Sequence, residues 1–399
     1  MKKDIRIIFV VLVLFSMACG IFDNFQELWL LKNNFSVKTI GTVFSLCAIL
    51  TVSTIFLCSN IIKKEKLKKF ITILLLIKVT ILLSLFFLNN SGLDFLITFL
   101  TMFEYVVTIE IFTSIYPLIA IIIKDNKVYA KKDIIYDAAY YIGILLTAFL
   151  LGKPIFNLTI TYNFYLLASS IITLIACIVI WKLDLSKYQK GSNTKITSNV
   201  LKNLIKKLDR DYISFGYLMT VLFNKTSWCI LFGLTTIMLV NGFGFTPFLS
   251  SNYVIIMGLI SVVIGSIVLA KLTLKNDYIN ISIKFAIRCL LLFLAGFIGS
   301  KVLLLIAFIY PKLLSDSYSH VTDAPYINRI DTEDQLAFCN LKEMFKYVGA
   351  AIGTYLCGIA ISINIQLVFI LAGIFCFVEL LVRYNILYLL NKEGRKNDR

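Results

Sequence analysis

Long apolar runs recur along the whole chain and constrain its fold more than any other feature. The runs are about 20 residues long, the length that a helix needs to cross the hydrocarbon core of a bilayer. Short stretches that contain lysine separate them. Because 59% of the 399 residues are hydrophobic and only 16% are charged, the chain has too little polar surface for a soluble globule. The sequence therefore predicts an all-α, polytopic membrane protein and argues against soluble enzymes.

We predict twelve transmembrane helices by matching the apolar runs to a helical rise of about 1.5 Å per residue. The predicted spans are Ile5–Leu31, Lys38–Ile62, Phe70–Leu88, Leu93–Ile123, Ile134–Gly152, Tyr162–Trp181, Tyr212–Val240, Phe248–Leu272, Ile281–Ile298, Val302–Ile327, Leu341–Ile361 and Gln366–Leu390. Several runs exceed what a perpendicular helix needs, and we expect tilt there. The first run is too long for a signal peptide, so a retained first helix is expected.

The net charge of +16 falls mainly on one set of loops. Lysine and arginine resist translocation near the ends of spans, so the basic loops are expected to be cytoplasmic. The loops on the opposite side hold only Lys32, Lys38, Lys153 and Lys301. This distribution predicts a cell-membrane protein with both termini in the cytoplasm. The excess positive charge is thereby explained by the orientation of the chain in the membrane. We therefore expect no binding of nucleic acid.

The longest polar segment, 184–210, divides the predicted spans into six and six. We predict an N-terminal six-helix bundle at 1–183, a basic cytoplasmic linker at 184–210 and a C-terminal six-helix bundle at 211–399. Within the linker, Val200 to Leu208 has apolar residues at helical spacing among lysines. This stretch either lies on the membrane surface or is a basic connector that only follows the charge rule.

The two halves resemble each other at an offset of about 206 to 210 residues. The spacing from Asp137 to Gly143 returns between Glu343 and Gly349, and Lys78 in the third span is matched by an arginine in the ninth. Such internal similarity is typical of transporters whose substrate lies between two repeats. The sequence therefore predicts two pseudo-symmetric bundles that meet at a substrate cavity.

The loop after the second span reads SNIIKKEKLKK from Ser59 to Lys69. It keeps the basic end of the signature Gly-x-x-x-Asp-Arg-x-Gly-Arg-Lys but lacks the glycines and the aspartate. Gly143 and Gly152 keep part of the glycine-rich fifth span of drug antiporters, whereas Phe156 and Asn157 replace its closing Gly-Pro. With its 6+6 layout, the chain resembles a divergent member of the major facilitator superfamily of secondary transporters over essentially its full length. The resemblance implies alternating access, and antiport does not follow from it.

A charged group deep in a bilayer costs at least about 2.5 to 3.5 kcal/mol on insertion scales, so it is a candidate functional residue. Lys225 lies near the centre of the seventh span, next to Asn224 and three residues before Trp228. A cation beside an aromatic ring suits an anionic or aromatic substrate. We predict that these three residues, with Tyr105 and Asn24, bind the substrate. A structural ion pair is the alternative role for Lys225.

Carboxylic acids in the first and fourth spans are the candidates for proton coupling. They are Asp23, Glu27, Glu104 and Glu110. Burial in low dielectric favours the protonated form of a carboxyl group, which reversible coupling requires. A nearby Lys225 would oppose this effect, so that protonation and substrate binding compete. Asp23 and Glu27 have an alternative interpretation as markers of the wet outer end of the first span.

The tenth predicted span is unusually polar. Asp316, His320 and Asp323 fall on one helical face at i, i+4 and i+7. A histidine between two carboxylates can relay protons near neutral pH, and a watery vestibule is the alternative. Lys78 and Arg288, on helices at the lipid edge of the expected fold, are predicted to snorkel or to pack against their neighbours.

These features predict a transporter that acts as a monomer in the bilayer and is not an enzyme. We expect proton-coupled efflux of a small amphipathic organic compound, with proton-coupled uptake of a small anionic metabolite as the alternative. A lipid-modifying membrane enzyme is more remote, because the loops are short and hold no catalytic constellation. A channel would need a repeated filter motif. With one histidine and cysteines inside apolar spans, no metal or cofactor is expected.

Overall fold

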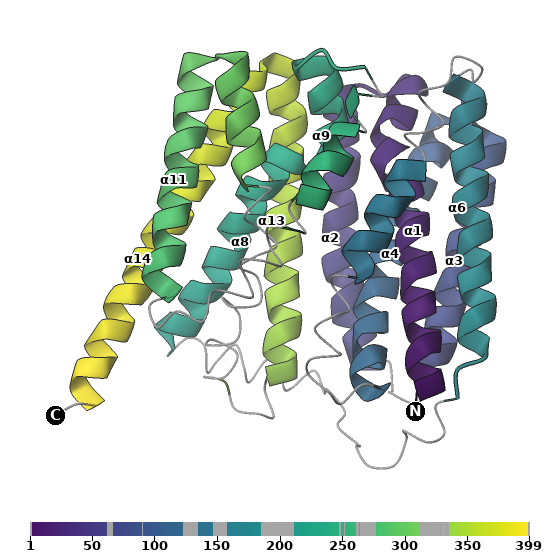
Figure 1. The fold of residues 1–399 in the computed structure, drawn as a ribbon, viewed down its shortest axis with the longest axis horizontal. Helices are drawn as coiled ribbons and strands as arrows, with labels where there is room; N and C mark the ends of the chain where they lie inside the picture. The colour runs from purple at the N-terminus through teal and green to yellow at the C-terminus, as the bar shows by residue number, and fades with distance from the viewer. Residues whose placement is uncertain are drawn as a thin grey trace. The chain divides into compact units, whose positions relative to one another are not determined.

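Helices make up almost all of the chain that the structure describes (Figure 1). The computed structural model describes residues 2–61, 67–89, 91–122, 135–146, 158–184, 211–246, 249–250, 252–260, 263, 277–311, 330 and 335–397. The named elements are α1 (Lys2–Lys32), α2 (Val37–Ile61), α3 (Leu67–Leu88), α4 (Asp94–Ile122), α6 (Leu158–Trp181), α8 (Tyr212–Phe232), α9 (Thr235–Ile237), η3 (Met238–Gly242), α11 (Asp277–Ile298), α13 (Gln335–Ile363) and α14 (Ile365–Asn397). Other helical segments include Ile135–Leu146, 252–260 and Lys301–Pro311.

Each of the twelve predicted spans overlaps a helical segment of the described chain. Seven of the described helices are long and apolar enough to cross a membrane, and α8 with the segment Thr235–Gly242 adds an eighth if this pair, bent by 42°, is one span. Helices are the expected outcome because a helix satisfies its own backbone hydrogen bonds where no water is present. The prediction of an all-α membrane fold is confirmed.

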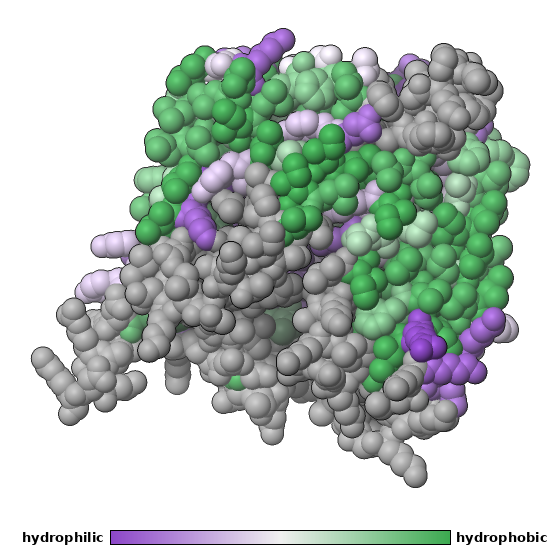
Figure 2. All heavy atoms as spheres, viewed as in Figure 1, coloured by the Kyte–Doolittle hydropathy of each residue, from purple (hydrophilic) through white to green (hydrophobic). Residues whose placement is uncertain are grey.

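The outer surfaces of the helices are apolar, as a lipid-facing surface requires. Ile178 of α6 is 57% exposed and Leu290 of α11 is 59% exposed. Figure 2 shows hydrophobic residues over much of the visible surface of α6 and α11. In water such broad exposure of large aliphatic side chains would promote association, whereas in a bilayer it is the solvated state.

Contacts divide the chain into two compact units. Unit 1 comprises Met1–Ser36, Ser53–Lys195 and Leu239–Leu259. Within it α1 packs on α6 and α4, and α3 packs on α4 and α6. The buried hydroxyl of Ser169 on α6 donates a hydrogen bond of 2.9 Å to the carbonyl oxygen of Ala18 on α1. This bond ties two apolar helices together at the depth of the bilayer.

Unit 2 comprises Val37–Val52, Ile196–Met238 and Ile260–Arg399. Within it α8 packs on α13 and α14, and α14 also packs on α11 and α13. The buried Ser227 of α8 donates a 2.8 Å hydrogen bond to the carbonyl oxygen of Ala372 on α14. The predicted bundles at 1–183 and 211–399 remain a prediction, and the predicted linker lies outside the described residues beyond Asp184.

Glycines allow the first and fifth helices of each predicted half to touch backbone to backbone. A methyl group on Gly143 would lie 2.4 Å from the carbonyl oxygen of Met17 on α1. A methyl group on Gly349 of α13 would likewise lie 2.4 Å from the carbonyl oxygen of Leu222 on α8. The offset of the sequence repeat relates Gly143 to Gly349, and it relates Met17 to Leu222 to within one residue. The close crossing is therefore built twice, which supports the predicted duplication.

Candidate functional site

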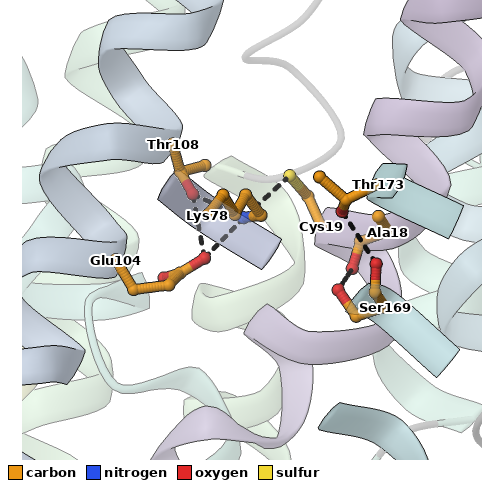
Figure 3. Close-up of polar contacts among 7 residues, drawn as sticks. All are labelled: Ala18, Cys19, Lys78, Glu104, Thr108, Ser169 and Thr173. Atoms are coloured by element: carbon orange, nitrogen blue, oxygen red, sulfur yellow. Dashed lines mark hydrogen bonds and ion pairs between the residues drawn. The ribbon is translucent and has the colours of Figure 1, made fainter. Parts of the chain in front are cut away.

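Lys78 lies in the interior of unit 1, among apolar residues in the middle of α3. Leu75 and Val79 share its buried face of α3, and Lys78 itself is 0% exposed. Its Nζ atom lies 2.5 Å from Oε1 of Glu104 and 2.5 Å from Oγ1 of Thr108 (Figure 3). Glu104 and Thr108 are four residues apart, so both project from one face of α4. An ion pair therefore joins α3 to α4 inside the unit.

Hydrogen bonds close this network and extend it to α1. The hydroxyl of Thr108 accepts from Lys78 and donates to Oε1 of Glu104 at 2.9 Å. On α1, the Cys19 sulfur lies 3.8 Å from Nζ of Lys78 and the Phe15 ring centroid lies 5.4 Å from it. The ammonium group is thus held by an anion, a hydroxyl, a thiol and an aromatic face.

A second carboxylate lies near the same lysine. Asp23, about one turn after Cys19 on α1, interacts electrostatically with Lys78 and Glu104. Two ionised carboxylates around one ammonium group carry a net charge of −1, which is unfavourable in low dielectric. A single proton on either carboxyl group makes the cluster neutral. The cluster has the charges needed to take up and release one proton.

The burial of Lys78 corrects the prediction that it lies at the lipid edge. Arg288, its counterpart in the repeat, is also buried, at 6% exposed. It donates from Nη2 to the hydroxyl of Ser227 at 2.9 Å, and its guanidinium lies over the ring of Phe285. Snorkelling is therefore wrong for both residues, and packing against neighbours is right. Depth was the available signal, since Lys78 is near the middle of α3 and far from either interface.

The other predicted proton-coupling residues have different surroundings. Glu110 of α4 is buried at 4% exposed, and Glu27 of α1 is half-buried. Among the described acids, Glu104 and Asp23 interact with Lys78. The structure does not describe Asp316, His320, Asp323 or the side chain of Asn24, so these predictions lie outside the described residues.

Lys225 lies half-buried on α8 in unit 2, where its charge acts on Glu343 of α13. Glu343 also pairs with two lysines of its own helix, at 3.6 Å from Lys342 and 3.1 Å from Lys346. Within unit 2, Glu343 on the eleventh predicted span is an acidic neighbour of Lys225.

Trp228 starts a row of three aromatic rings in unit 2. Its ring centroid lies 4.2 Å from that of Phe232, which lies 4.7 Å from that of Phe308 in the segment Lys301–Pro311. Tyr105, the other predicted aromatic contact, is half-buried on α4 of unit 1. The row is a run of packed aromatic rings that begins one helical turn from Lys225.

Asn224 faces α14 rather than the lysines of α13. Its amide donates to both carboxylate oxygens of Glu379, at 3.1 and 3.0 Å. Glu379 is 0% exposed and pairs with Arg383 at 2.7 Å. This pair was not predicted from the sequence. Its signal is an isolated acid in the apolar run FCFVELLVRY, followed four residues later by an arginine.

Comparisons with known proteins find likeness in structure. The chain matches no family model, and no curated protein matches it. A mutant form of the nucleoside transporter NupG matches with a TM-score of 0.72 at 12% identity, over 96% of this chain and 99% of that chain. The D-xylose-proton symporter matches with a TM-score of 0.68 at 10% identity, over 96% and 97%. The human organic anion transporter MFSD10 matches with a TM-score of 0.64 at 9% identity, over 96% and 99%.

Likeness at such low identity concerns the fold. The matches extend over nearly the whole of this chain and of each solved structure. They agree with the apolar spans and the doubled helix crossing described above. The fold that the sequence resemblance implied is confirmed: this chain has the fold of these solved transporters.

Proposed function

We propose that this chain is a secondary transporter that moves a small organic solute by alternating access and is coupled to protons. Its fold is shared with a nucleoside transporter, a xylose-proton symporter and an organic anion transporter, which supports a carrier. The observation that carries the coupling is the buried pair of Lys78 and Glu104 with Asp23 nearby. An intramembrane ion pair is costly to keep unless it serves a function.

The proposed coupling works through the choice of partner for Lys78. Ionised Glu104 holds Lys78 on the α4 side, with Thr108 bridging the two. Protonation of Glu104 cancels its charge, and Asp23 on α1 then becomes the anionic neighbour of Lys78. The proton thereby shifts the attraction of α3 from α4 towards α1. A ligand or a proton shifts the balance between two conformations only if it interacts more favourably with one of them than with the other.

For the substrate, we propose a small amphipathic organic compound, moved outward. The aromatic row of Trp228, Phe232 and Phe308 supports an apolar body for the solute. Uptake of a small anionic metabolite is the second candidate, and the lysines around Glu343 favour it. Lys225 and Trp228 are proposed as substrate contacts in both cases.

The test is solute flux in proteoliposomes under an imposed pH gradient. A panel of labelled neutral, cationic and anionic organic solutes is offered to the wild-type protein and to Glu104→Gln. We expect the wild type to move at least one solute against its gradient when protons flow, and the sign of the driving gradient gives the direction. Glu104→Gln should lose gradient-driven accumulation and keep solute exchange at equal pH, because the variant cannot release a proton.

Asp94→Asn is the matched control. Asp94 lies on the same helix as Glu104 but is exposed at its start, so this variant should keep both activities. If Glu104→Gln accumulates solute as the wild type does, Glu104 is not the coupling residue. If the wild type moves no solute of the panel, the transporter proposal fails.

We also propose a cell-membrane location with both termini cytoplasmic and a monomer as the working unit. The distribution of lysine and arginine over the loops supports the orientation. Epitope tags at the two termini should resist protease added to intact cells and be cleaved after permeabilisation. Cleavage of either tag in intact cells would contradict the orientation.

A further inference from the structure

Two cysteines of unit 2 face each other across neighbouring helices. Cys289 lies on α11 and Cys376 lies on α14, and these helices pack against each other (Figure 1). Each thiol is a side-chain hydrogen-bond partner of the other. Both are free thiols in the structure. The proposed proton coupling uses neither residue.

The two sulfur atoms also contact the backbone in a reciprocal way. Sγ of Cys289 lies 3.7 Å from the carbonyl oxygen of Gly373, which is three residues before Cys376. Sγ of Cys376 lies 3.7 Å from the carbonyl oxygen of Phe285, which is four residues before Cys289. Each sulfur therefore reaches the helical turn that precedes the other cysteine. Both side chains point across the contact between the helices rather than into lipid.

Glycines bring the two helices close together within two turns of the cysteines. A methyl group on Gly296 of α11 would lie 3.1 Å from the backbone nitrogen of Ile370 on α14. A methyl group on Gly373 of α14 would lie 3.1 Å from a ring carbon of Phe293 on α11. A disulfide needs Cα atoms about 4.4 to 6.8 Å apart, so it can join two helices only where they pack closely. The contact of α11 with α14 is of this close kind.

A buried guanidinium group acts on both thiols. Arg288, next to Cys289 in sequence, interacts electrostatically with each of the two cysteines. Its partner on α8 is a neutral hydroxyl, that of Ser227, and its Nε atom has no hydrogen-bond partner among the described residues. A cation beside a thiol stabilises the thiolate, which is the form that reacts with oxidants. Arg288 is therefore placed to activate the pair.

The two thiols differ in their charged neighbours. Cys376 lies one turn before Glu379, and the negative charge of Glu379 opposes a thiolate there. For Cys289, the charge that acts is the positive charge of Arg288. Cys289 is also the more exposed of the two, at 5% against 0%. Cys289 is thus the better placed to attack an oxidant first, and Cys376 to attack second.

We propose that Cys289 and Cys376 form a reversible disulfide that joins α11 to α14, with a hydroperoxide as the oxidant. The Cys289 sulfur attacks one oxygen of hydrogen peroxide, the O–O bond breaks, and the other oxygen leaves as water with the thiol proton. The Cys376 sulfur then attacks the resulting sulfenic acid, and its hydroxyl group leaves as a second water with the Cys376 proton. Two electrons pass from the sulfurs to the peroxide. This modification site does not depend on the proposed transport.

The test is to map the disulfide in the whole protein. Full-length protein in phosphatidylcholine nanodiscs is reduced, freed of reductant and treated with hydrogen peroxide. The remaining thiols are alkylated, and the peptides are analysed by mass spectrometry without reduction. Two of the nine cysteines should escape alkylation, and the peptide with Cys289 should be linked to the peptide with Cys376. Dithiothreitol should restore both thiols. No link, or a link of either residue to another cysteine, would overturn the proposal.

Single cysteine variants test the order of attack. In Cys376→Ser, peroxide should leave Cys289 as a sulfenic acid, which dimedone traps. In Cys289→Ser, dimedone should label Cys376 much more slowly, because the thiol that attacks first is missing. Equal labelling in the two variants would overturn the assigned order.

Arginine variants test the role of the guanidinium group. Arg288→Met should slow disulfide formation by about tenfold or more, because an adjacent opposite charge changes the ratio of thiolate to thiol by at least about one order of magnitude. Arg288→Lys should recover most of the rate, since it restores the positive charge. Equal rates in the wild type and Arg288→Met would show that Arg288 does not activate the pair.

Cys177 on α6 is the matched control. It is buried, and its sulfur lies 3.8 Å from a backbone carbonyl oxygen, that of Thr72. Among the described residues, no second thiol contacts it. Cys177→Ser should form the disulfide at the wild-type rate, and Cys177 in the wild type should stay reduced at the peroxide dose that oxidises the pair. Oxidation of Cys177 as fast as the pair would mean that peroxide attacks buried thiols without selection, and the proposal would fail.

Discussion

Lys78 in unit 1 and Arg288 in unit 2 are buried cations at matching positions of the repeat, yet their partners differ. Lys78 has a carboxylate at 2.5 Å and a hydroxyl that bridges the two charges. Arg288 has the hydroxyl of Ser227 at 2.9 Å, and its Nε atom has no hydrogen-bond partner among the described residues. The repeat has kept the position of the cation, whereas its described partner is a carboxylate in unit 1 and a hydroxyl in unit 2.

The acid that unit 2 does bury is used differently. Glu379 pairs with Arg383 on its own helix, and Asn224 of α8 donates to both of its oxygens. Arg383 also lies over Phe285, 4.3 Å from the ring centroid. An acid with a guanidinium and an amide as fixed donors is well satisfied as an anion. This pair therefore joins α14 to α8 through fixed donors, in contrast to the Lys78 pair, which has a second carboxylate, Asp23, nearby.

The largest effect should come from breaking the Lys78 pair. Lys78→Met leaves Glu104 buried beside no cation, and we expect a loss of about 3 to 5 kcal/mol of stability in thermal unfolding in detergent. The double variant Lys78→Met with Glu104→Gln should recover most of that stability, because both charges are gone, but not proton-driven flux.

Arg288→Met sharpens the same comparison. It leaves a serine hydroxyl rather than a carboxylate without its partner, so it should lower stability by about 1 to 3 kcal/mol in the same assay. A loss as large as that of Lys78→Met would mean that Arg288 balances an anion of its own, and the contrast between the two units would fail.

The glycine crossings should respond alike in the two units. Gly143→Ala and Gly349→Ala each force a methyl group to within 2.4 Å of a backbone oxygen. We expect a loss of about 1 to 3 kcal/mol for each, measured by thermal unfolding. Gly216→Ala is the control, because its nearest neighbour is a side-chain carbon of Ile386 at 3.0 Å, which can move. A much smaller loss at either crossing would show that only one half depends on close contact.

The smallest effect concerns the two buried serines. Ser169→Ala removes one interhelical hydrogen bond to Ala18 and should lower stability by about 0.6 kcal/mol. Ser227→Ala removes the bond to Ala372 and also the partner of Arg288, so a loss of about 1 to 2 kcal/mol is expected. Equal losses in unfolding experiments would mean that Arg288 gains nothing from Ser227.

The fold could be predicted from the sequence because it follows from local properties. Apolar length predicted the spans, and the spacing of Gly143 and Gly349 predicted a repeat whose close contacts the structure contains. The burial of Glu104 also followed from its place in an apolar run. Each of these inferences needs only one helix and the solvent around it.

Pairings between helices could not be predicted in the same way. Glu104 and Lys78 were both selected as unusual residues, but their contact depends on how α3 and α4 are rotated about their axes. Asn224 and Lys225 are neighbours in sequence, yet successive residues on a helix point about 100° apart, so one faces Glu379 on α14 and the other acts on Glu343 on α13. The residue types along the sequence do not show how each helix is rotated about its axis against its neighbours.

The doubled glycine crossing has a mechanical consequence for a carrier with this fold. Where two helix backbones touch without intervening side chains, they have no layer of flexible atoms in which to slide. The segment Ile135–Leu146 and α1 in unit 1, and α13 and α8 in unit 2, therefore each behave as a single stiff strut. In the proposed alternating access, the motion would have to be absorbed outside these two crossings, and the 42° bend follows α8 at the end of one of them.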